Sequence, residues 1–209
     1  MDDIAFFKTL VTTLQGHLTI DSNRIFAVGM SNGAMMSYTL AAEMSNVFAA
    51  VSPIAGTVGG QPQATAPLWL PPAPLNPVSI MAFHGKLDDN VPYLGGEGGD
   101  SLDKGRVDQN VMDSISFWLQ ADGIIAPPKE AVSASHNIVT DTFTGGKNGT
   151  EVVLVTINNG GHSWPGVSTF EKPAADAMEI NATQMSWQFF KSHPKVIGTT
   201  KTNAADGGM

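Results

Sequence analysis

The sequence predicts an α/β protein whose mainly parallel sheet carries helices on both faces, giving three layers. Short apolar runs, which suit buried strands, alternate along the chain with segments whose apolar residues recur at helical spacing. Residues 29–33 form a glycine-flanked turn between a predicted strand and a predicted helix. With 209 residues, the chain is long enough for one hydrophobic core and short for two. A ligand site is expected at the carboxyl ends of the strands.

The first half of the chain predicts a helix followed by a β-α-β unit. Residues 2–16 carry apolar side chains at helical spacing. Residues 24–30 are rich in β-branched and aromatic residues and predict a strand, and a helix is expected to run from there to about residue 45. Residues 47–53 predict a strand buried on both faces. Six prolines and two adjacent glycines then make residues 56–77 a surface loop.

The second half predicts three more strands and two more helices around one core. The strands are expected at residues 78–83, 138–143 and 152–157, and the helices at residues 106–121 and 176–191. The small, polar residues at the carboxyl end favour disorder. The sequence thus predicts a single domain over residues 1–194 and a disordered tail over residues 195–209.

Composition excludes several classes of partner. Eleven basic against nineteen acidic residues give a net charge of −8, so the basic surface that a nucleic-acid partner requires is not expected. No apolar stretch approaches the roughly 18 to 20 residues that span a bilayer, so no membrane partner is expected. The chain has no cysteine, and no zinc or iron pattern is present, so neither a metal nor another cofactor is predicted.

Ser31 is the candidate nucleophile. It occupies the centre of Gly29-Met30-Ser31-Asn32-Gly33, a G-x-S-x-G pattern placed between a strand and a helix. In this turn, called a nucleophile elbow, a strained backbone lifts the serine hydroxyl off the edge of the sheet, and the glycines let strand and helix pass closely.

A serine hydroxyl needs a base, and His162 is the candidate that the sequence favours. It follows the strand predicted at 152–157, in a loop whose glycines permit a tight turn toward the elbow. His84 ends a buried strand and is expected to be a hydrogen-bonded structural residue. The remaining three histidines lie in turns or the tail and are expected to be solvated: His17, His136 and His193.

The acid that would orient the base is expected after the strand at 78–83. Asp88 lies there and preserves the order serine, aspartate, histidine along the chain. Asp89 is the alternative, and either carboxylate could instead be a turn former. Trp164, two residues after His162, is expected to bind substrate as a pocket wall, with simple packing as the alternative. Residues 68–70 could form a similar apolar rim.

Three segments together resemble a known family. Residues 24–36, 84–93 and 161–166 resemble, in order and spacing, the polyhydroxybutyrate-depolymerase and feruloyl-esterase-like family of α/β-hydrolases, and the likeness runs from about residue 2 to 194. The resemblance implies a serine carboxylic-ester hydrolase with Ser31 as nucleophile, Asp88 as acid and His162 as base. It also implies a small-molecule or polymeric ester as substrate and an extracellular or periplasmic location.

The chain departs from the family pattern at its front. The family has strands and a His-Gly loop before the segment that matches residues 2–16, so the resemblance implies a shortened α/β-hydrolase fold with its front strands missing. The missing loop normally supplies one oxyanion-hole N–H, which leaves the backbone N–H of Asn32. Loss of one donor costs about 10²-fold to 10³-fold in rate, so turnover remains expected.

The predicted strand at 24–30 would then be an exposed sheet edge. Three explanations of the missing front strands are open: the chain is a fragment, it is a minimal hydrolase, or it is a domain completed by another chain. We expect self-association through this edge. Two alternative functions remain at this point. The same residues could cleave an amide or peptide bond, or the chain could be a catalytically silent, hydrolase-like binding module.

Overall fold

The computed structural model describes residues 2–98, 104–167 and 178–196. Its main sheet has six strands in the order β1-β2-β4-β9-β8-β7. The first four run parallel, whereas β8 and β7 are antiparallel to their neighbours. The predicted α/β class with a mainly parallel sheet is therefore confirmed. The strands of this sheet are β1 (Phe26–Met30), β2 (Ala50–Ile54), β4 (Ser79–Gly85), β7 (Lys129–Val132), β8 (Ile138–Phe143) and β9 (Val152–Ile157).

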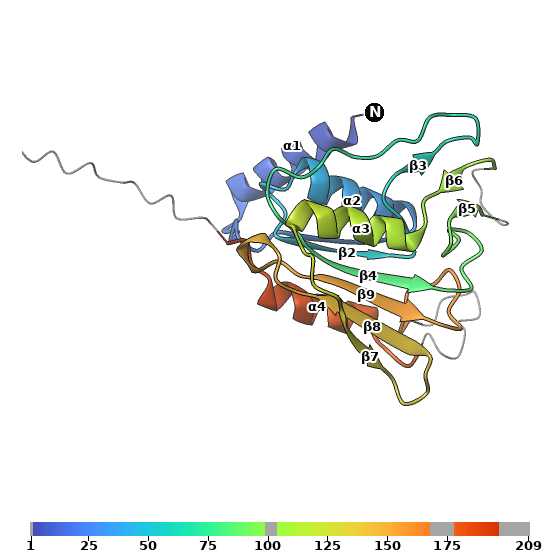
Figure 1. Ribbon diagram of the computed structural model, residues 1–209. Helices are drawn as coiled ribbons and strands as arrows, with labels where there is room; N and C mark the ends of the chain where they lie inside the picture. The colour runs from blue at the N-terminus through green and yellow to red at the C-terminus, as the bar shows by residue number, and fades with distance from the viewer. Residues whose placement is uncertain (1, 99–103, 168–177, 197–209) are drawn as a thin grey trace, which may run out of the picture.

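Helices cover both faces of the sheet (Figure 1). Helices α2 and α3 lie on one face and α4 on the other, while α1 lies outside α2. Alternation along the buried strand β4 explains the layers, because Ile80 and Ala82 join the core under α2 and α3, whereas Met81 and Phe83 join the core under α4. The helices are α1 (Asp3–His17), α2 (Asn32–Glu43), α3 (Val111–Asp122) and α4 (Ala182–Ser192).

Two predicted strands agree with the structure at both ends, whereas other predicted elements differ from it. Strands β8 and β9 coincide with the predicted ranges. Helix α3 begins at Val111 and not at residue 106, because the Asn110 side chain accepts a hydrogen bond from the Met112 N–H and caps the helix there. Strand β7 was not predicted, since all four of its residues are exposed and lack an apolar alternation. Helix α4 begins at Ala182, and residues 168–177 lie outside the described residues.

A second, small sheet stands above the carboxyl ends of the main strands on the α2 side (Figure 1). Its three short strands pair in the order β3-β6-β5, and β3 lies within the predicted surface loop. The same loop returns so that Trp69 bridges back to Gly60. The strands are β3 (Gly60–Gln61), β5 (Gly96–Glu97) and β6 (Val107–Asp108).

The two edges of the main sheet differ. Strand β1 forms one edge, and its Val28 side chain is 45% exposed. Strand β7 forms the other edge and carries the charged residues Lys129 and Glu130. Charged side chains on an edge oppose pairing with another chain, whereas an apolar edge permits it.

The last described residues are held against the domain. The Lys195 N–H donates to the Asn23 carbonyl at 2.8 Å, and its Nζ donates to the carbonyls of Asn46 and Val47. Of the predicted tail, residues 195 and 196 are described, and residues 197–209 lie outside the described residues. The expectation that His193 is solvated is wrong, because its Nε2 lies 3.2 Å from Glu151 Oε2.

Candidate active site

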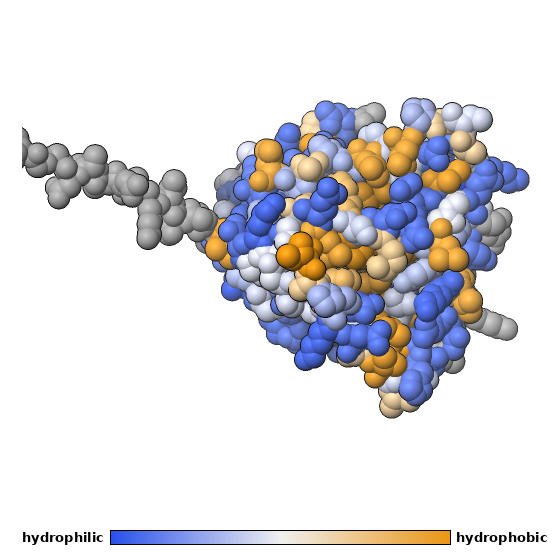
Figure 2. Space-filling view, viewed as in Figure 1, coloured by the Kyte–Doolittle hydropathy of each residue, from blue (hydrophilic) through white to orange (hydrophobic). Residues whose placement is uncertain are grey.

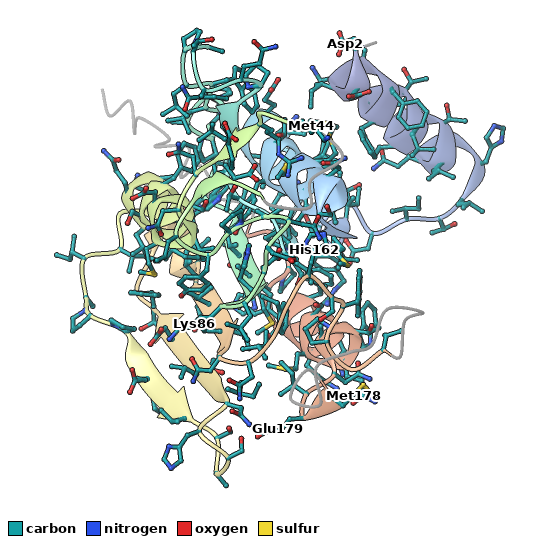
Figure 3. All side chains as sticks on the ribbon, turned by 90° about the vertical axis from the view of Figure 1, so that its right-hand side faces the viewer. Asp2, Met44, Lys86, His162, Met178 and Glu179 are labelled. Carbon is teal, nitrogen blue, oxygen red and sulfur yellow. The ribbon has the colours of Figure 1, made fainter. Side chains whose placement is uncertain are left out.

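Each of the three candidate residues follows one of three parallel strands. These strands end at the same side of the main sheet, its carboxyl edge, which is distinct from the lateral edges formed by β1 and β7. Ser31 follows β1, Asp88 follows β4 and His162 follows β9. Figure 3 views the molecule onto this edge and labels His162 between α2 and α4. Backbone bonds continue from strand to strand at this edge: the Ser31 N–H donates to the Ile54 carbonyl, and the Ala55 N–H donates to the Phe83 carbonyl.

The turn at Ser31 has the strained conformation expected of a nucleophile elbow. Ser31 has φ 59° and ψ −122°, values that L-residues rarely adopt. A Cβ at Gly29 would lie 2.4 Å from the Gly33 carbonyl oxygen, so only glycine lets β1 pass the start of α2. Gly56, two residues after β2, likewise lets the chain pass the start of α2, because a Cβ there would lie 2.6 Å from the Ala34 Cβ.

Asn32 is the first residue of α2. The first N–H groups of a helix have no acceptor within that helix, and the helix dipole makes this end favourable for negative charge. Ala34 and Met35 both donate to the Ser31 carbonyl, which ties the turn to the helix. The Asn32 N–H is therefore located where a negative charge developing beside Ser31 could be stabilised.

Asp88 and His162 are in direct contact. His162 Nδ1 lies 2.9 Å from Asp88 Oδ2 and 3.1 Å from Oδ1. The Asp88 side chain is buried, and its Oδ1 also accepts the N–H groups of Asn90 at 3.0 Å and Val91 at 2.8 Å. These bonds fix the carboxylate and hold the imidazole ring by its Nδ1 atom. His162 Nε2 is the ring nitrogen left to act on another group.

Two glycines let the His162 loop pass close to the Asp88 loop. A Cβ at Gly85, the last residue of β4, would lie 2.2 Å from the Gly160 carbonyl oxygen. The Leu87 N–H donates to that same carbonyl at 2.9 Å. This close approach follows from strand pairing, because β4 and β9 are neighbours.

Ser31 lies further along the carboxyl edge of the sheet, away from the Asp88–His162 pair. Strand β1 is two positions from β4, a distance of about 10 Å at roughly 4.8 Å for each parallel neighbour. Within the described residues, Ser31 Oγ and His162 Nε2 make no hydrogen bond to each other. Catalytic hydrogen bonds are often long in a protein without substrate and shorten in the substrate complex.

His84 is a buried, hydrogen-bonded neighbour of this pair, as expected of a structural histidine. Its Nε2 lies 2.8 Å from the Val91 carbonyl, which can only accept, so Nε2 carries the proton. Burial lowers the pKa of His84, although Asp88, 3.4 Å away, favours the charged form. A neutral His84 thus holds the turn that carries Asp88.

The remaining candidates differ in their surroundings. Asp89 is exposed, so only Asp88 of the two aspartates contacts His162. Trp164 packs against the core under α4, and its Nε1 donates to Thr183 Oγ1 at 3.0 Å. Trp164 therefore joins the His162 loop to the start of α4, and its role in substrate binding stays a prediction.

Sequence reasoning missed the groups that support the site. Gly56 and Gly85 were missed because they act through contacts with segments far along the chain. Each lies shortly after a predicted strand, which was the sequence signal that could have found them. Among the described residues, no three His, Cys, Asp or Glu side chains are grouped to hold a metal ion. No helix in the same ranges is both long and apolar enough to cross a membrane.

Comparison with known proteins finds esterases. The chain is 26% identical over 189 residues to "Putative esterase NocK" of Nocardia uniformis, covering 82% of the chain and 51% of that protein. It is 26% identical over 185 residues to "Feruloyl esterase B" of Piromyces equi, covering 82% and 32% respectively. It is 28% identical over 194 residues to "Probable feruloyl esterase C" of Aspergillus clavatus, covering 90% and 57%. No protein-family model matches the chain.

A solved structure supports the fold. The acetyl xylan esterase from Aspergillus awamori aligns with a TM-score of 0.51 and 18% identity, over 89% of this chain and 66% of that one. At this identity the likeness concerns the fold alone. The resemblance to feruloyl-esterase-like proteins is confirmed by the three relatives, and its polyhydroxybutyrate-depolymerase part stays a prediction. The chain spans between 32% and 57% of the length of these three curated relatives.

Proposed function

We propose that this feruloyl-esterase-like chain is a serine carboxylic-ester hydrolase that acts through Ser31, His162 and Asp88. The observation that carries the proposal is the Asp88–His162 pair, with 2.9 Å between Oδ2 and Nδ1, at the same sheet edge as the strained turn of Ser31. The named relatives, which are called esterases, agree with this chemistry.

The proposed mechanism assigns one task to each residue. His162 Nε2 accepts the proton of the Ser31 hydroxyl while Oγ forms a bond to the ester carbonyl carbon. The Asn32 N–H stabilises the oxyanion, and His162 returns the proton to the departing alcohol. Water then attacks the acyl-enzyme with His162 as base, which releases the acid and restores Ser31. Asp88 holds Nδ1–H and stabilises the charged imidazole.

Small or polymeric esters are the proposed substrates, and short acyl groups are expected because no lid is recognisable in the sequence. Hydrolysis of p-nitrophenyl esters with chains of two to eight carbons measures this preference. A rate that rises toward the longest chain would contradict it. An amide substrate is the alternative within the same mechanism, and esters come first because they are easier to cleave.

Labelling of Ser31 tests the function and separates it from a silent binding module. A fluorophosphonate probe should add one adduct per chain on Ser31, located by mass spectrometry. Ser31→Ala should abolish both the adduct and ester hydrolysis, a loss of about 10⁴-fold or more in kcat. Ser116→Ala, which changes an exposed serine of α3, should leave both unchanged. An unlabelled Ser31 in folded protein would overturn the assignment.

Self-association through β1 and an extracellular or periplasmic location remain parts of the proposal. Light scattering across micromolar concentrations should show a mass above that of one chain, which Val28→Lys should reduce to the monomer value. Val132→Lys on β7 is the matched control, since Val28 and Val132 are 45% and 46% exposed. A strict monomer at all concentrations would contradict self-association. Retention of the protein inside the producing cells would contradict the extracellular or periplasmic location.

A further inference from the structure

Two residues with a rare backbone conformation lie side by side at the carboxyl edge of the main sheet. Among the described residues, four residues other than glycine have a positive φ. Two of them, His136 and Asn148, are exposed and lie in short turns. The other two are Ser31, with φ 59°, and Ala55, with φ 54°. Each directly follows its strand, and β1 pairs with β2 up to the last residue of both, so Ser31 and Ala55 are neighbours.

Ala55 adopts this conformation at a buried position. It is 2% exposed and belongs to the core under α4. A left-handed backbone is unfavourable for alanine, because its Cβ crowds the following carbonyl oxygen. The Ala55 N–H donates to the Phe83 carbonyl of β4 at 2.8 Å. The next residue, Gly56, reaches the elbow, where its Cβ would lie 2.9 Å from the Ser31 carbonyl oxygen. The turn at Ala55 therefore connects β4 to the elbow.

A narrow crevice separates Ala55 from the loop that carries His162. Ala55 and Gly85, at the ends of β2 and β4, line one part of it, and the two neighbours of His162, Gly161 and Ser163, line another. The crevice has no room for a water molecule. Because protein interiors are close-packed, the position of the His162 loop relative to the elbow depends on the residues that line this crevice.

The end of β2 lies between the nucleophile and its base. Strand β1 leads to Ser31, β4 and β9 lead to Asp88 and His162, and β2 separates β1 from β4. We propose that Ala55 is a positioning residue that sets the separation between Ser31 Oγ and His162 Nε2. Its left-handed turn seats Gly56 against the elbow, and its small side chain lets the His162 loop approach. This role rests on the proposed function, because the separation matters only if the two residues act together.

Ala55→Gly tests the role, since glycine removes the strain and the methyl group and leaves the turn free to adopt other conformations. A misplacement of about 1 Å can cost about 10²-fold in rate, so kcat for p-nitrophenyl acetate should fall about ten-fold or more. KM should stay within about two-fold. The urea midpoint should change little, because relief of strain offsets the larger entropy of glycine in the unfolded chain. A merely structural role would lower the midpoint and leave kcat unchanged.

His136→Gly is the matched control, because it relieves the same kind of strain away from the site. His136 has φ 62° and lies in the exposed turn between β7 and β8. Figure 1 draws this turn at the lowest point of the view, well below α2, and Figure 2 shows it projecting there from the surface. His136→Gly should leave both kcat and KM unchanged. An equal fall of kcat in the two glycine variants would overturn the special role of Ala55.

The dependence on His162 gives the second readout. In His162→Ala protein, the remaining catalysis comes from the oxyanion hole and from substrate binding, so it does not depend on the separation between serine and base. Adding Ala55→Gly should therefore change the rate of His162→Ala protein by less than about two-fold, although it lowers the rate of the unmodified chain about ten-fold. The same fall in both backgrounds would show that Ala55 acts without the base and would overturn the proposal.

The outcomes separate this role from the proposed function. If the unmodified chain hydrolyses esters and Ala55→Gly keeps its kcat, the positioning role is wrong and the proposed function stands. If the folded, unmodified chain neither hydrolyses esters nor accepts a fluorophosphonate on Ser31, both are wrong.

Discussion

The two ends of the main sheet carry different kinds of side chain. At the carboxyl end, α2 begins beside the strained Ser31, and the Asp88–His162 pair is formed by loops that glycines bring together. At the amino end, α2 and α3 finish, and basic side chains cover the carbonyls there. Lys195 donates to the Asn46 and Val47 carbonyls, and Lys147 Nζ donates to the Ala121 carbonyl at 2.9 Å.

The direction of the helix dipoles explains this difference. In a β-α-β unit the positive helix ends gather at the carboxyl edge of the sheet, where they favour an anion, and the negative ends gather at the opposite edge, where they favour lysine. The contrast teaches that changes at the carboxyl end should alter chemistry, whereas changes at the amino end should alter stability and its pH dependence.

The largest expected effect is at the carboxyl end and breaks the Asp88–His162 pair. Asp88→Asn removes the charge that stabilises the imidazolium, and its amide can donate where Nδ1–H must donate, so kcat for ester hydrolysis should fall about 10⁴-fold. Initial rates with p-nitrophenyl acetate measure the fall. Asp89→Asn, one residue away and exposed, should keep full activity. A reversed ranking of the two variants would move the acid to Asp89.

The next effect tests the strain of the elbow. Gly29→Ala places a Cβ 2.4 Å from the Gly33 carbonyl oxygen, so the turn must shift, and the free energy of unfolding should fall by about 3 kcal/mol, the upper part of the usual overpacking range. Urea denaturation measures it. Gly33→Ala is the control, because its Cβ would meet no atom within 4 Å. Equal stabilities of the two variants would contradict the close approach of β1 and α2.

The smallest effect concerns the amino end, at Asp122. This carboxyl is fully buried at the end of α3, where it accepts the Val78 N–H at 3.4 Å, and burial raises its pKa from 3.8 to about 6. Between these two values the folded chain binds the proton more tightly than the unfolded chain does. The stability that Asp122 contributes is therefore fully present below about pH 4 and is lost as the pH rises through about 6.

Asp122→Asn should remove this pH dependence. The difference in unfolding free energy between the variant and the unmodified chain should grow by about 2 to 3 kcal/mol from pH 4 to pH 7, in favour of the variant. Urea denaturation at steps of half a pH unit measures the difference. A difference that stays constant across this range would show that Asp122 titrates alike in the folded and unfolded chain.

What the sequence determined by itself was local. The spacing of Gly29, Ser31 and Gly33 predicted the turn, since one strand, one tight turn and one helix start lie within a dozen residues. The β-branched and aromatic residues at 138–143 and the apolar run at 152–157 predicted β8 and β9, because strand-forming residues follow one another in each segment. Asp88 and His162 each follow a predicted strand of a mainly parallel sheet, which also predicted that they would meet at the carboxyl ends of the strands.

Only the tertiary structure decided features that depend on contacts between distant segments. Asp88 and Asp89 differ by one position, and only the contact with His162, 74 residues further along the chain, shows which of the two carboxylates lies against the imidazole. Met35 of α2, Trp69 of the proline-rich loop and Asp108 of β6 line one groove. Strand β7 has no apolar alternation of its own. These features arise from chain packing, and their energies depend on neighbours that are tens of residues away.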